Sequence, residues 1–201
     1  MTAKRKLLLL TGEKATHKEI LRDGLELYAE VLTFSGPVSP EFVRDHDVWA
    51  IVSDRNGHIL SEDVLVAVEG RAYNSHPSVL PLHRGWQPIF FSVWYGTEVG
   101  ISIHQIDRGL DTGNLVFQST IDVRPGDRLE TLHYRCRLEI LRGWCDVIAQ
   151  LAVGQVHFWK QTGAGSYHPR SKFDRLFSRL PSGWRTEVAV VREIAARSLE
   201  S

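Results

Sequence analysis

The sequence of 201 residues has no excess of charge of either sign, because 24 lysine and arginine residues balance 24 aspartate and glutamate residues. A balanced chain has no global electrostatic field that would attract nucleic acid or an anionic membrane surface. A large polyanionic partner is therefore disfavoured, and we expect neither nucleic acid nor a membrane among the partners.

Long hydrophobic runs are also lacking. The apolar run Leu7–Leu10, which follows the basic residues Lys4–Lys6, is shorter than the roughly 7–15 residues that a signal peptide needs. No stretch approaches the ~20 apolar residues of a membrane-spanning helix. The sequence therefore predicts a cytoplasmic protein.

Cysteine is scarce, since the chain contains only Cys136 and Cys145. Both fall in a segment that we expect to be helical, where nine residues turn the chain by about 900° and so place the two thiols on opposite faces. They cannot form a disulfide within that helix, and two thiols without clustered partners do not make a metal site. We expect two reduced thiols and no metal.

The first third of the chain alternates short apolar runs with segments of helical spacing. Ser39 before Pro40 is typical of a helix N-cap followed by proline at the first helical position, and Ser61 begins a further helix that Gly70 ends. The alternation predicts right-handed crossovers and a parallel sheet. The expected strands are Leu7–Leu10, Val31–Phe34, Val48–Ser53 and Ala72–Asn74, and a helix is expected at His17–Glu30.

The rest of the chain predicts a helix that Gly96 closes, two antiparallel strands and one long helix. We therefore expect an α/β fold with an abbreviated Rossmann-like, mostly parallel sheet flanked by helices, an antiparallel strand addition and a helical C-terminal appendage. The loop Gln161–Ser166 would separate a main domain, residues 1–160, from the appendage, residues 161–201, packed on it. The expected elements are helix Pro88–Tyr95, strands Val99–Ile106 and Asn114–Ile121, helix Arg128–Val153, strand Val156–Trp159, and helices around Lys172–Leu180 and Thr186–Leu199.

Asn74 and His76 lie two residues apart at the end of a predicted strand, so their side chains point to the same side. Pro77 fixes the backbone just beyond them and keeps His76 extended. Ligands of open parallel sheets bind outside the carboxyl ends of the strands. These residues alone leave two interpretations open: a pair of catalytic groups, or a polar turn in which Asn74 caps a loop and His76 lies at the surface.

The segment Asp107–Gly113 forms the loop between the two predicted antiparallel strands. Gly109 and Gly113 permit unusual backbone angles or the close approach of a ligand. An aspartate here could orient and charge-stabilise an imidazole. The alternative is a turn whose aspartates hydrogen-bond their own backbone, which explains Asp107 better than Asp111.

Taken together, these motifs resemble the 10-formyltetrahydrofolate-dependent formyltransferase family, whose members act on methionyl-tRNA, glycinamide ribonucleotide and nucleotide-linked amino sugars. The order and spacing match from about Asp54 to Gln118. Weaker similarity to the small nucleotide-sugar members continues through Gly165–His168 and Gly183–Thr186. The motifs that carry the resemblance are Asn74–Pro81, Arg84–Gly85, Ile103–Asp107 and Leu110–Asn114.

The resemblance places Asn74, His76 and Asp111 on the catalytic positions of the family, so that residues 1–160 would form the catalytic domain. It implies that a neutral amine attacks the formyl carbon of N10-formyltetrahydrofolate. Asn74 and a protonated His76 would donate hydrogen bonds to the oxygen of the tetrahedral intermediate. Asp111 would favour the charged imidazole and help relay the proton of the amine.

The resemblance also implies where the folate binds. The pterin would lie against Ile59 and Leu60, with backbone groups near His58 reading its edge and with Asp107 and Gly109 covering the other side. Plain core packing is the alternative for the side chains of Ile59 and Leu60.

The acceptor would contact residues that follow the catalytic strand, namely Arg84, Gly85, Trp86 and Trp94. The other tryptophans are expected to pack in the core or on helix faces. His104 also matches a family position, but a histidine on an alternating strand is more often a structural residue whose hydrogen bonds are satisfied.

Departures from the family pattern reduce the number of acceptor classes that fit this sequence. The turn Thr11–Lys14 lacks the glycine- and asparagine-rich sequence that holds phosphate in the purine-pathway members, and Glu13 would repel a phosphate. The chain ends before a C-terminal barrel of the transfer-RNA type could fit. We therefore expect a small amine, most of all a nucleotide-linked amino sugar, as the acceptor.

Three alternatives stay open at this point. The protein could hydrolyse formyltetrahydrofolate with water as the acceptor, act on another small amine such as an amino-acid derivative, or bind folate or a nucleotide sugar without catalysis. A homodimer is an open alternative to a monomer.

Overall fold

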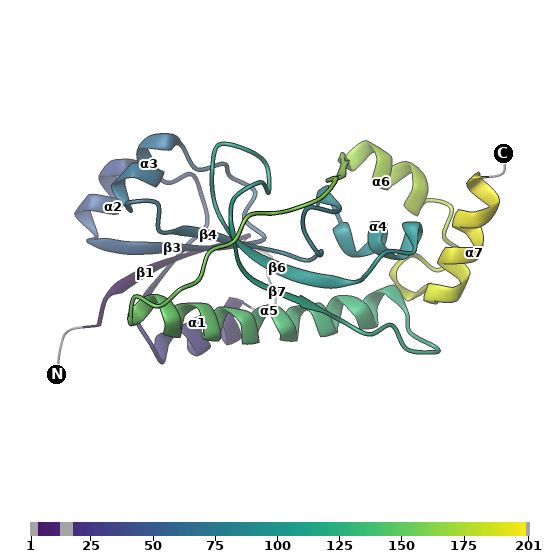
Figure 1. Ribbon diagram of the computed structural model, residues 1–201, viewed down its shortest axis with the longest axis horizontal. Helices are drawn as coiled ribbons and strands as arrows, with labels where there is room; N and C mark the ends of the chain where they lie inside the picture. Colours follow the sequence, from purple (N-terminus) through teal and green to yellow (C-terminus); the bar gives the residue numbers. More distant parts are fainter. Residues whose placement is uncertain (1–3, 13–17, 200–201) are drawn as a thin grey trace. The chain divides into compact units, whose positions relative to one another are not determined.

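The computed structural model describes residues 4–12 and 18–199, and the chain forms two compact units (Figure 1). The first unit contains Met1–Ser75, Ile103–Phe117 and Leu141–Lys160, and the second contains His76–Ser102, Gln118–Ile140 and Gln161–Ser201. The expected division into residues 1–160 and 161–201 stays a prediction.

Six strands of the described residues form one sheet: β1 (Lys6–Thr11), β2 (Glu30–Phe34), β3 (Val48–Asp54), β4 (Ala72–His76), β6 (Gly100–Gln105) and β7 (Leu115–Thr120). Their order is β2-β1-β3-β4-β6-β7, and the pairs β1–β2, β1–β3 and β3–β4 are parallel. β6 and β7 run antiparallel, because the Gln105 N–H donates to the Asn114 carbonyl at one end and the Ile121 N–H donates to the Val99 carbonyl at the other. The mostly parallel sheet with an antiparallel addition is therefore confirmed.

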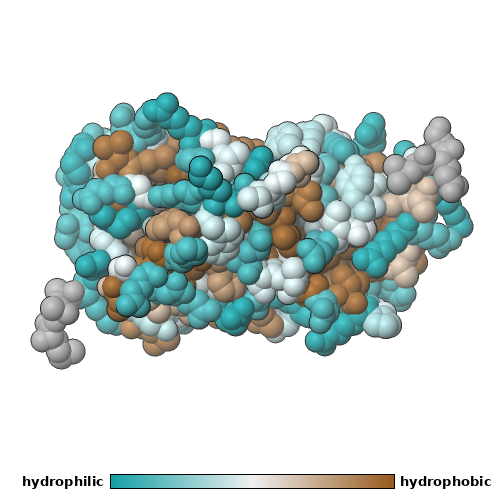
Figure 2. Space-filling view, in the orientation of Figure 1, coloured by the Kyte–Doolittle hydropathy of each residue, from teal (hydrophilic) through white to brown (hydrophobic). Residues whose placement is uncertain are grey.

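The first unit buries β1 from Leu7 to Thr11, and the leucines of this strand alternate between two faces. Leu8 and Leu10 pack into a cluster with residues of α2 (Pro40–Asp45) and α3 (Glu62–Ala67). The caps predicted at Ser39 and Ser61 are confirmed, since each side chain accepts a hydrogen bond from the helix that follows. In Figure 2 a patch of hydrophobic side chains (brown) lies over α2 and α3, and Val66 of α3 is exposed.

Two further helices belong to the first unit in whole or in part. α1 (Lys18–Glu26) confirms a helix within the predicted range His17–Glu30 but ends four residues earlier, and Glu30 is instead the first residue of β2. His17, like Glu13 and Lys14, lies outside the described residues. α5 (Leu129–Ala152) is the long helix, and Gly24 of α1 lies against its Leu141 and Cys145 side chains. The cysteines are both free, as predicted. One apolar face of α5, with the helical spacing of its residues, is buried throughout: Leu129, Leu132, Cys136, Ile140, Trp144, Val147 and Leu151.

The second unit has an aromatic core. α4 (Pro88–Tyr95) presents Phe90, whose ring lies 5.3 Å from that of Phe173 and 5.9 Å from that of Phe177 in α6 (Arg170–Phe177). The ring of Trp184, in the 3₁₀ turn η1 (Gly183–Arg185), lies 4.5 Å from that of Phe177. α7 (Val188–Leu199) packs on α4 and completes the helical C-terminal appendage.

Two features differ from the sequence-based expectation. The strand predicted at Val156–Trp159 is wrong, because only Trp159 pairs with a neighbour, exchanging both backbone hydrogen bonds with Leu115 at the start of β7. A short parallel pair, β5 (Arg84–Gly85) with β8 (Tyr167–His168), was not predicted, since two residues carry no pattern. No helix among the described residues is long and apolar enough to cross a membrane.

Candidate active site

The carboxyl ends of β3 and β4 bring two polar side chains of the first unit together. Ser53 and Asn74 are register partners in these parallel strands, and the Ser53 hydroxyl donates to Asn74 Oδ1 over 3.0 Å. The next pair in register points to the other face, where the Ser75 hydroxyl donates to the buried Asp54 carboxylate over 2.5 Å. Because Ser53 occupies Oδ1, the Asn74 amide must turn its Nδ2 protons away from β3.

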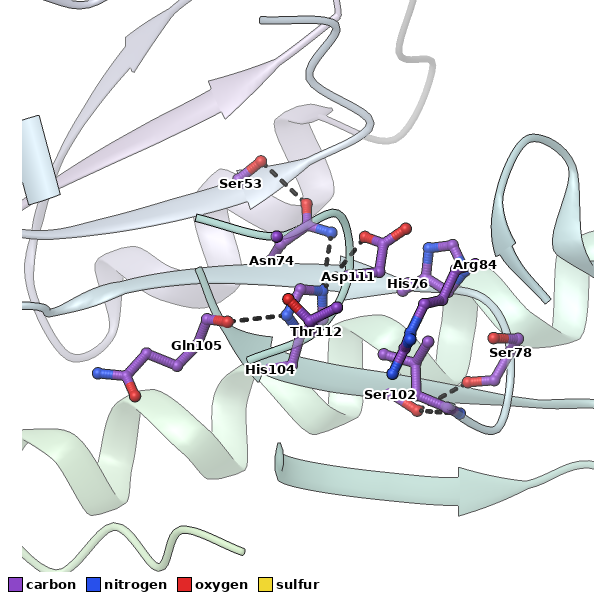
Figure 3. A network of polar contacts seen from close by, with 12 residues as sticks. Ser53, Asn74, His76, Ser78, Arg84, Ser102, His104, Gln105, Asp111 and Thr112 are labelled. Carbon is purple, nitrogen blue, oxygen red and sulfur yellow. Dashed lines mark hydrogen bonds and ion pairs between the residues drawn. The ribbon is translucent and has the colours of Figure 1, made fainter. Parts of the chain in front are cut away.

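The amide nitrogen of Asn74 faces His104 of β6. Its Nε2 lies 3.3 Å from Asn74 Nδ2, and its Nδ1 lies 2.9 Å from the Gln105 carbonyl oxygen (Figure 3). A carbonyl only accepts, so Nδ1 carries a proton and Nε2 of the neutral ring accepts from Asn74. The other Nδ2 proton of Asn74 can then donate to an oxygen of a bound substrate.

Asp111 completes this cluster from the loop between β6 and β7. Its Oδ1 lies 3.4 Å from His104 Nε2, with His104 3% and Asp111 10% exposed at the side chain. Asp111 has a φ of 55°, a left-handed conformation that a non-glycine residue adopts rarely and that is found more often at functional sites. If His104 Nε2 carried a proton, this nitrogen would donate to Asp111 and could no longer accept from Asn74.

The loop that carries Asp111 is held in one shape. The Asp107 carboxylate accepts from the Gly109 N–H over 3.0 Å and from the Thr112 hydroxyl over 2.6 Å. A Cβ at Gly113 would lie 1.8 Å from the Gln105 carbonyl oxygen, so this position must be glycine. Asp107 thus has the turn-forming role that was the alternative in its case.

His76, the last residue of β4, belongs to the second unit and is 5% exposed. Its Nε2 lies 2.9 Å from the main-chain oxygen of His83, which fixes a proton on Nε2. His76 follows Asn74 by two positions on the same strand, the spacing on which the sequence prediction rested.

The three residues expected to bind the pterin differ in environment. Leu60 is 7% exposed and belongs to the core cluster of β1, β3 and α3, so its side chain packs in the core. Ile59 is 93% exposed, and in the second loop Leu110 is 52% exposed. His58 is exposed, and its backbone N–H and carbonyl both bond to the Asn56 side chain.

The residues expected to contact the acceptor also differ in environment. Trp94 is 5% exposed and packs 5.4 Å from the Phe90 ring, inside the aromatic core. Trp86 is 42% exposed, and the Arg170 guanidinium lies 5.2 Å above its ring. Arg84 donates to Gln161 Oε1 over 2.7 Å. Gly85 has a φ of 91° and lies so close to β8 that a Cβ would be 2.7 Å from the His168 carbonyl oxygen.

Sequence reasoning missed the central position of His104, which it treated as structural. The signal that could have found it was its match to a family position together with its place on a strand beside β4. The predicted Asn74 and Asp111 meet through this ring rather than directly.

The sequence that carries these polar groups at the carboxyl edge of the sheet matches a known family. Residues 41–148 match the formyl transferase family, and the chain belongs to it. A methionyl-tRNA formyltransferase from Anaeromyxobacter sp. (strain K) is 38% identical over 105 residues, which cover 47% of this chain and 34% of that protein. A phosphoribosylglycinamide formyltransferase from Mycobacterium tuberculosis (strain ATCC 25618 / H37Rv) is 34% identical over 108 residues, 53% of this chain and 50% of that protein. The chain thus spans between a third and a half of the length of these curated relatives.

Solved structures resemble a larger part of the chain. The formyltransferase PseJ from Anoxybacillus kamchatkensis, in complex with UDP-4,6-dideoxy-4-formamido-L-AltNAc and tetrahydrofolate, has a TM-score of 0.84 and 29% identity, covering 94% of this chain and 99% of that one. A sugar N-formyltransferase from Shewanella sp FDAARGOS_354 has a TM-score of 0.72 at 19% identity, covering 95% of this chain and 86% of that one. The second likeness shows the fold alone.

Proposed function

We propose that this protein transfers the formyl group of N10-formyltetrahydrofolate to the primary amine of a nucleotide-linked amino sugar. The observation that carries the proposal is the Asn74 amide, which Ser53 and His104 orient with one Nδ2 proton left for a substrate oxygen. Membership of the formyl transferase family supplies the reaction, and the site supplies the groups it needs.

The chemistry asks for a donor to an oxygen that becomes negative. The amine nitrogen attacks the formyl carbon, the carbonyl electron pair moves to oxygen, and collapse expels the N10 nitrogen, which takes a proton to give tetrahydrofolate. A donor already oriented before the reaction stabilises this oxygen without reorganisation. Asn74 meets that requirement, because both ends of its amide are fixed.

The remaining task is to move the proton that the attacking amine loses. Asp111 lies beside His104 and is nearly buried, which suits a carboxylate that favours a charged imidazole or accepts a proton. We assign His76 to the formyl oxygen on the basis of its place two residues after Asn74 on β4. These roles for Asn74, His76 and Asp111 are part of the proposal.

The donor would bind against the two loops that expose apolar side chains. Ile59, almost fully exposed, and the half-exposed Leu110 offer the contact that a pterin ring needs, and the loop of Asp107 and Gly109 is rigid enough to form a wall. Backbone groups near His58 would read the polar edge of the ring, while Leu60 supports the loop from the core.

The acceptor would bind on the second unit along β5 and β8. Arg84 and Tyr167 are register partners, Tyr167 and Trp86 are both exposed, and Arg170 lies over the Trp86 ring. Exposed aromatic rings can stack on a nucleobase, and arginines match the charge of a diphosphate. This combination supports a nucleotide-linked acceptor, with Gly85 allowing the close strand pairing that brings these side chains together.

The experiment is an assay of purified protein with N10-formyltetrahydrofolate and a panel of nucleotide-linked amino sugars, with tetrahydrofolate release and formylated product both measured. We expect both products with at least one amino sugar, and neither with His76→Ala. Release of tetrahydrofolate without an amine would instead select hydrolysis. If the protein formylated only glycinamide ribonucleotide or an amino acid, a nucleotide-linked amino sugar would be refuted as the acceptor. No turnover with any amine would refute formyl transfer itself.

The acceptor surface has a separate test. Because Trp86 would touch the acceptor and not the donor, Trp86→Ala should raise KM for the nucleotide sugar while KM for the folate changes by less than about 2-fold. Tyr134→Ala, which removes an exposed aromatic ring from α5, is the matched control and should change neither KM. If KM for the acceptor were unchanged in Trp86→Ala, the nucleobase would not bind at this surface.

A further inference from the structure

The strands that carry the Ser53–Asn74 hydrogen bond are joined by a second side-chain bond on the opposite face of the sheet. The next register pair along β3 and β4 is Asp54 with Ser75. The Ser75 hydroxyl donates to Asp54 Oδ1 over 2.5 Å, a length typical of a hydroxyl bonded to a carboxylate. Because successive residues of a strand point to opposite faces, the two bonds cross the same pair of strands from both sides. We call Asp54 and Ser75 the strand-end pair.

The strand-end pair lies where the pairing of β3 with β4 ends. Its members are the last register partners of the two strands, and Arg55 then turns the chain away from β3 with a φ of 56°. The ends of paired strands open more readily than their centres, because backbone hydrogen bonds hold them from one side only. The side-chain bond therefore restrains the strand ends at the place where the Asn74 amide must be held.

Asp54 has a residue with a hydroxyl group as its register partner on each side in the sheet. Ser75 is its partner on β4, and Thr11 is its partner on β1, and all three residues are buried. Thr11 Oγ1 has no hydrogen-bond partner among the described residues, so the carboxylate bonds to the hydroxyl of β4 and not to that of β1. The bond thus joins β3 to the strand that carries Asn74.

Packing alone does not explain a carboxylate at this place. Burying a carboxylate costs free energy, and a well-packed apolar pair would fill the same space without that cost. Ser75 is one of the contacts that Asp54 makes in the interior. A hydroxyl–carboxylate bond adds a defined distance between two strands, which apolar contacts specify less sharply. The strand-end pair therefore contributes geometry at the edge of the sheet where catalysis is proposed.

We propose that the strand-end pair positions the catalytic amide: it fixes the end of β3 against that of β4 and thereby keeps the Ser53 hydroxyl on Asn74 Oδ1. The proposal rests on the proposed function, in which Asn74 donates to the formyl oxygen. Asp54 and Ser75 are positioning residues, because they point to the face of the sheet opposite to Asn74 and act on the reaction only through it.

The first test is a double-mutant cycle. Ser75→Ala removes the bond, and we expect kcat to fall roughly 10-fold while KM for the folate and KM for the acceptor change by less than about 2-fold. In an Asn74→Ala background the same substitution should change kcat by less than about 2-fold, because the group through which it acts is already missing. Equal losses of kcat in both backgrounds, or losses confined to KM, would overturn the proposal.

Thr11→Val is the matched control, since it removes the buried hydroxyl on the other side of Asp54 without removing a hydrogen bond between described residues. We expect its kcat to be unchanged. A loss as large as that of Ser75→Ala would show that any change at this buried edge disturbs the site, and it would also overturn the proposal. If Ser75→Ala does not fold, Asp54→Asn, which weakens the bond and keeps an oxygen that can accept from Ser75, takes its place in the cycle.

The second test does not depend on turnover. In protein labelled with ¹⁵N at asparagine, Asn74→Ala assigns the Nδ2 protons of Asn74, and their exchange with solvent reports how tightly the amide is held. We expect this exchange to be faster in Ser75→Ala than in the unmodified protein and in Thr11→Val. Equal exchange rates in all three would show that the strand-end pair does not hold the amide. If the unmodified protein transfers no formyl group, the proposed function fails, whereas the exchange measurement still decides the positioning of Asn74.

Discussion

At the scale of single residues, Asn74 is the most constrained group of the candidate site. Its amide oxygen accepts from Ser53 and one of its amide protons points to His104, so the side chain cannot rotate without breaking two hydrogen bonds. A catalytic donor gains most from such restraint, because no energy is spent on reorienting it when the charge appears.

Replacing Asn74 with alanine should therefore act on the chemical step. Loss of one oriented donor costs about 2.7–4 kcal/mol in the transition state, and we expect kcat to fall about 10²–10³-fold. Steady-state kinetics with saturating folate and acceptor measure this. Gln155→Ala, which removes an exposed amide, is the control; a loss of similar size in that variant, or a change only in KM for Asn74→Ala, would contradict the role.

The two cysteines should differ in reactivity. Burial raises the pKa of Cys136 to about 12, so that at pH 8 its reactive thiolate is almost absent, while Cys145 is partly exposed and the pKa of its thiol is raised to a lesser degree. We expect iodoacetamide to modify Cys145 first in the native protein and both cysteines in denaturant. Peptide mass spectrometry after a time course reads the order; faster labelling of Cys136 would show that α5 opens.

At the scale of elements, the loop between β6 and β7 acts as a unit. Asp107 closes it from within, Gly113 packs against the Gln105 backbone, and Arg108 forms an ion pair with Glu62 at the start of α3. The left-handed conformation of Asp111 depends on this closure. A change that opens the loop should therefore also displace the Asp111 carboxylate from the site.

Gly113→Ala tests that coupling. The added methyl group would overlap the Gln105 carbonyl, and relief of such overlap costs about 1–3 kcal/mol. We expect a lower melting temperature and, because Asp111 moves with the loop, a kcat reduced at least as much as in Asp111→Asn. Gly57→Ala, where no heavy atom lies within 4 Å of the added group, should leave the melting temperature unchanged. A stable and fully active Gly113→Ala variant would show that activity does not depend on the closed shape of this loop.

The elements that could be predicted from the sequence are those whose pattern is local. The apolar run of β1, the Ser39 cap before Pro40 and the seven buried positions of α5 all follow from periodicity and capping. The pairing of β5 with β8 could not be predicted, because it joins segments about 80 positions apart through two residues each. The strand predicted at Val156–Trp159 was wrong, because an apolar run indicates burial and says nothing about whether a partner strand exists.

The site was predictable to a similar extent. The spacing of Asn74 and His76 follows from the two-residue period of a strand, but the meeting of Asn74 with His104 depends on the order of strands in the sheet. Trp94 illustrates the opposite difficulty: its nearness in sequence to the motif suggested substrate contact, whereas its position on α4 turns the ring into the aromatic core.

At the scale of the whole molecule, two buried neutral histidines should make stability depend on pH. The pKa values of His83 and His168 are lowered from 6.5 to about 4, so the unfolded chain binds protons near pH 6.5 that the folded protein binds only near pH 4. The stability that these neutral rings contribute is therefore fully present above pH 6.5, and it falls as the pH is lowered towards 4, by on the order of 3 kcal/mol for each ring.

Urea unfolding at a series of pH values between 4 and 8 measures this dependence. In His168→Gln one of the two titrating groups is missing, and the decline should be about half as steep. A stability that stays constant between pH 6.5 and 4, or that rises on acidification, would show that these rings are charged in the folded protein.

The exposed Ile59 has a consequence for handling the protein. A large apolar side chain that is 93% exposed gains nothing from folding, and it contributes only when something covers it. If the folate does so, the donor acts as a stabilising additive by mass action, worth about 2.7 kcal/mol when its concentration is 100 times the dissociation constant. Purification and storage with a folate analogue should then raise both yield and shelf life, and Ile59→Ser should make the protein indifferent to the additive.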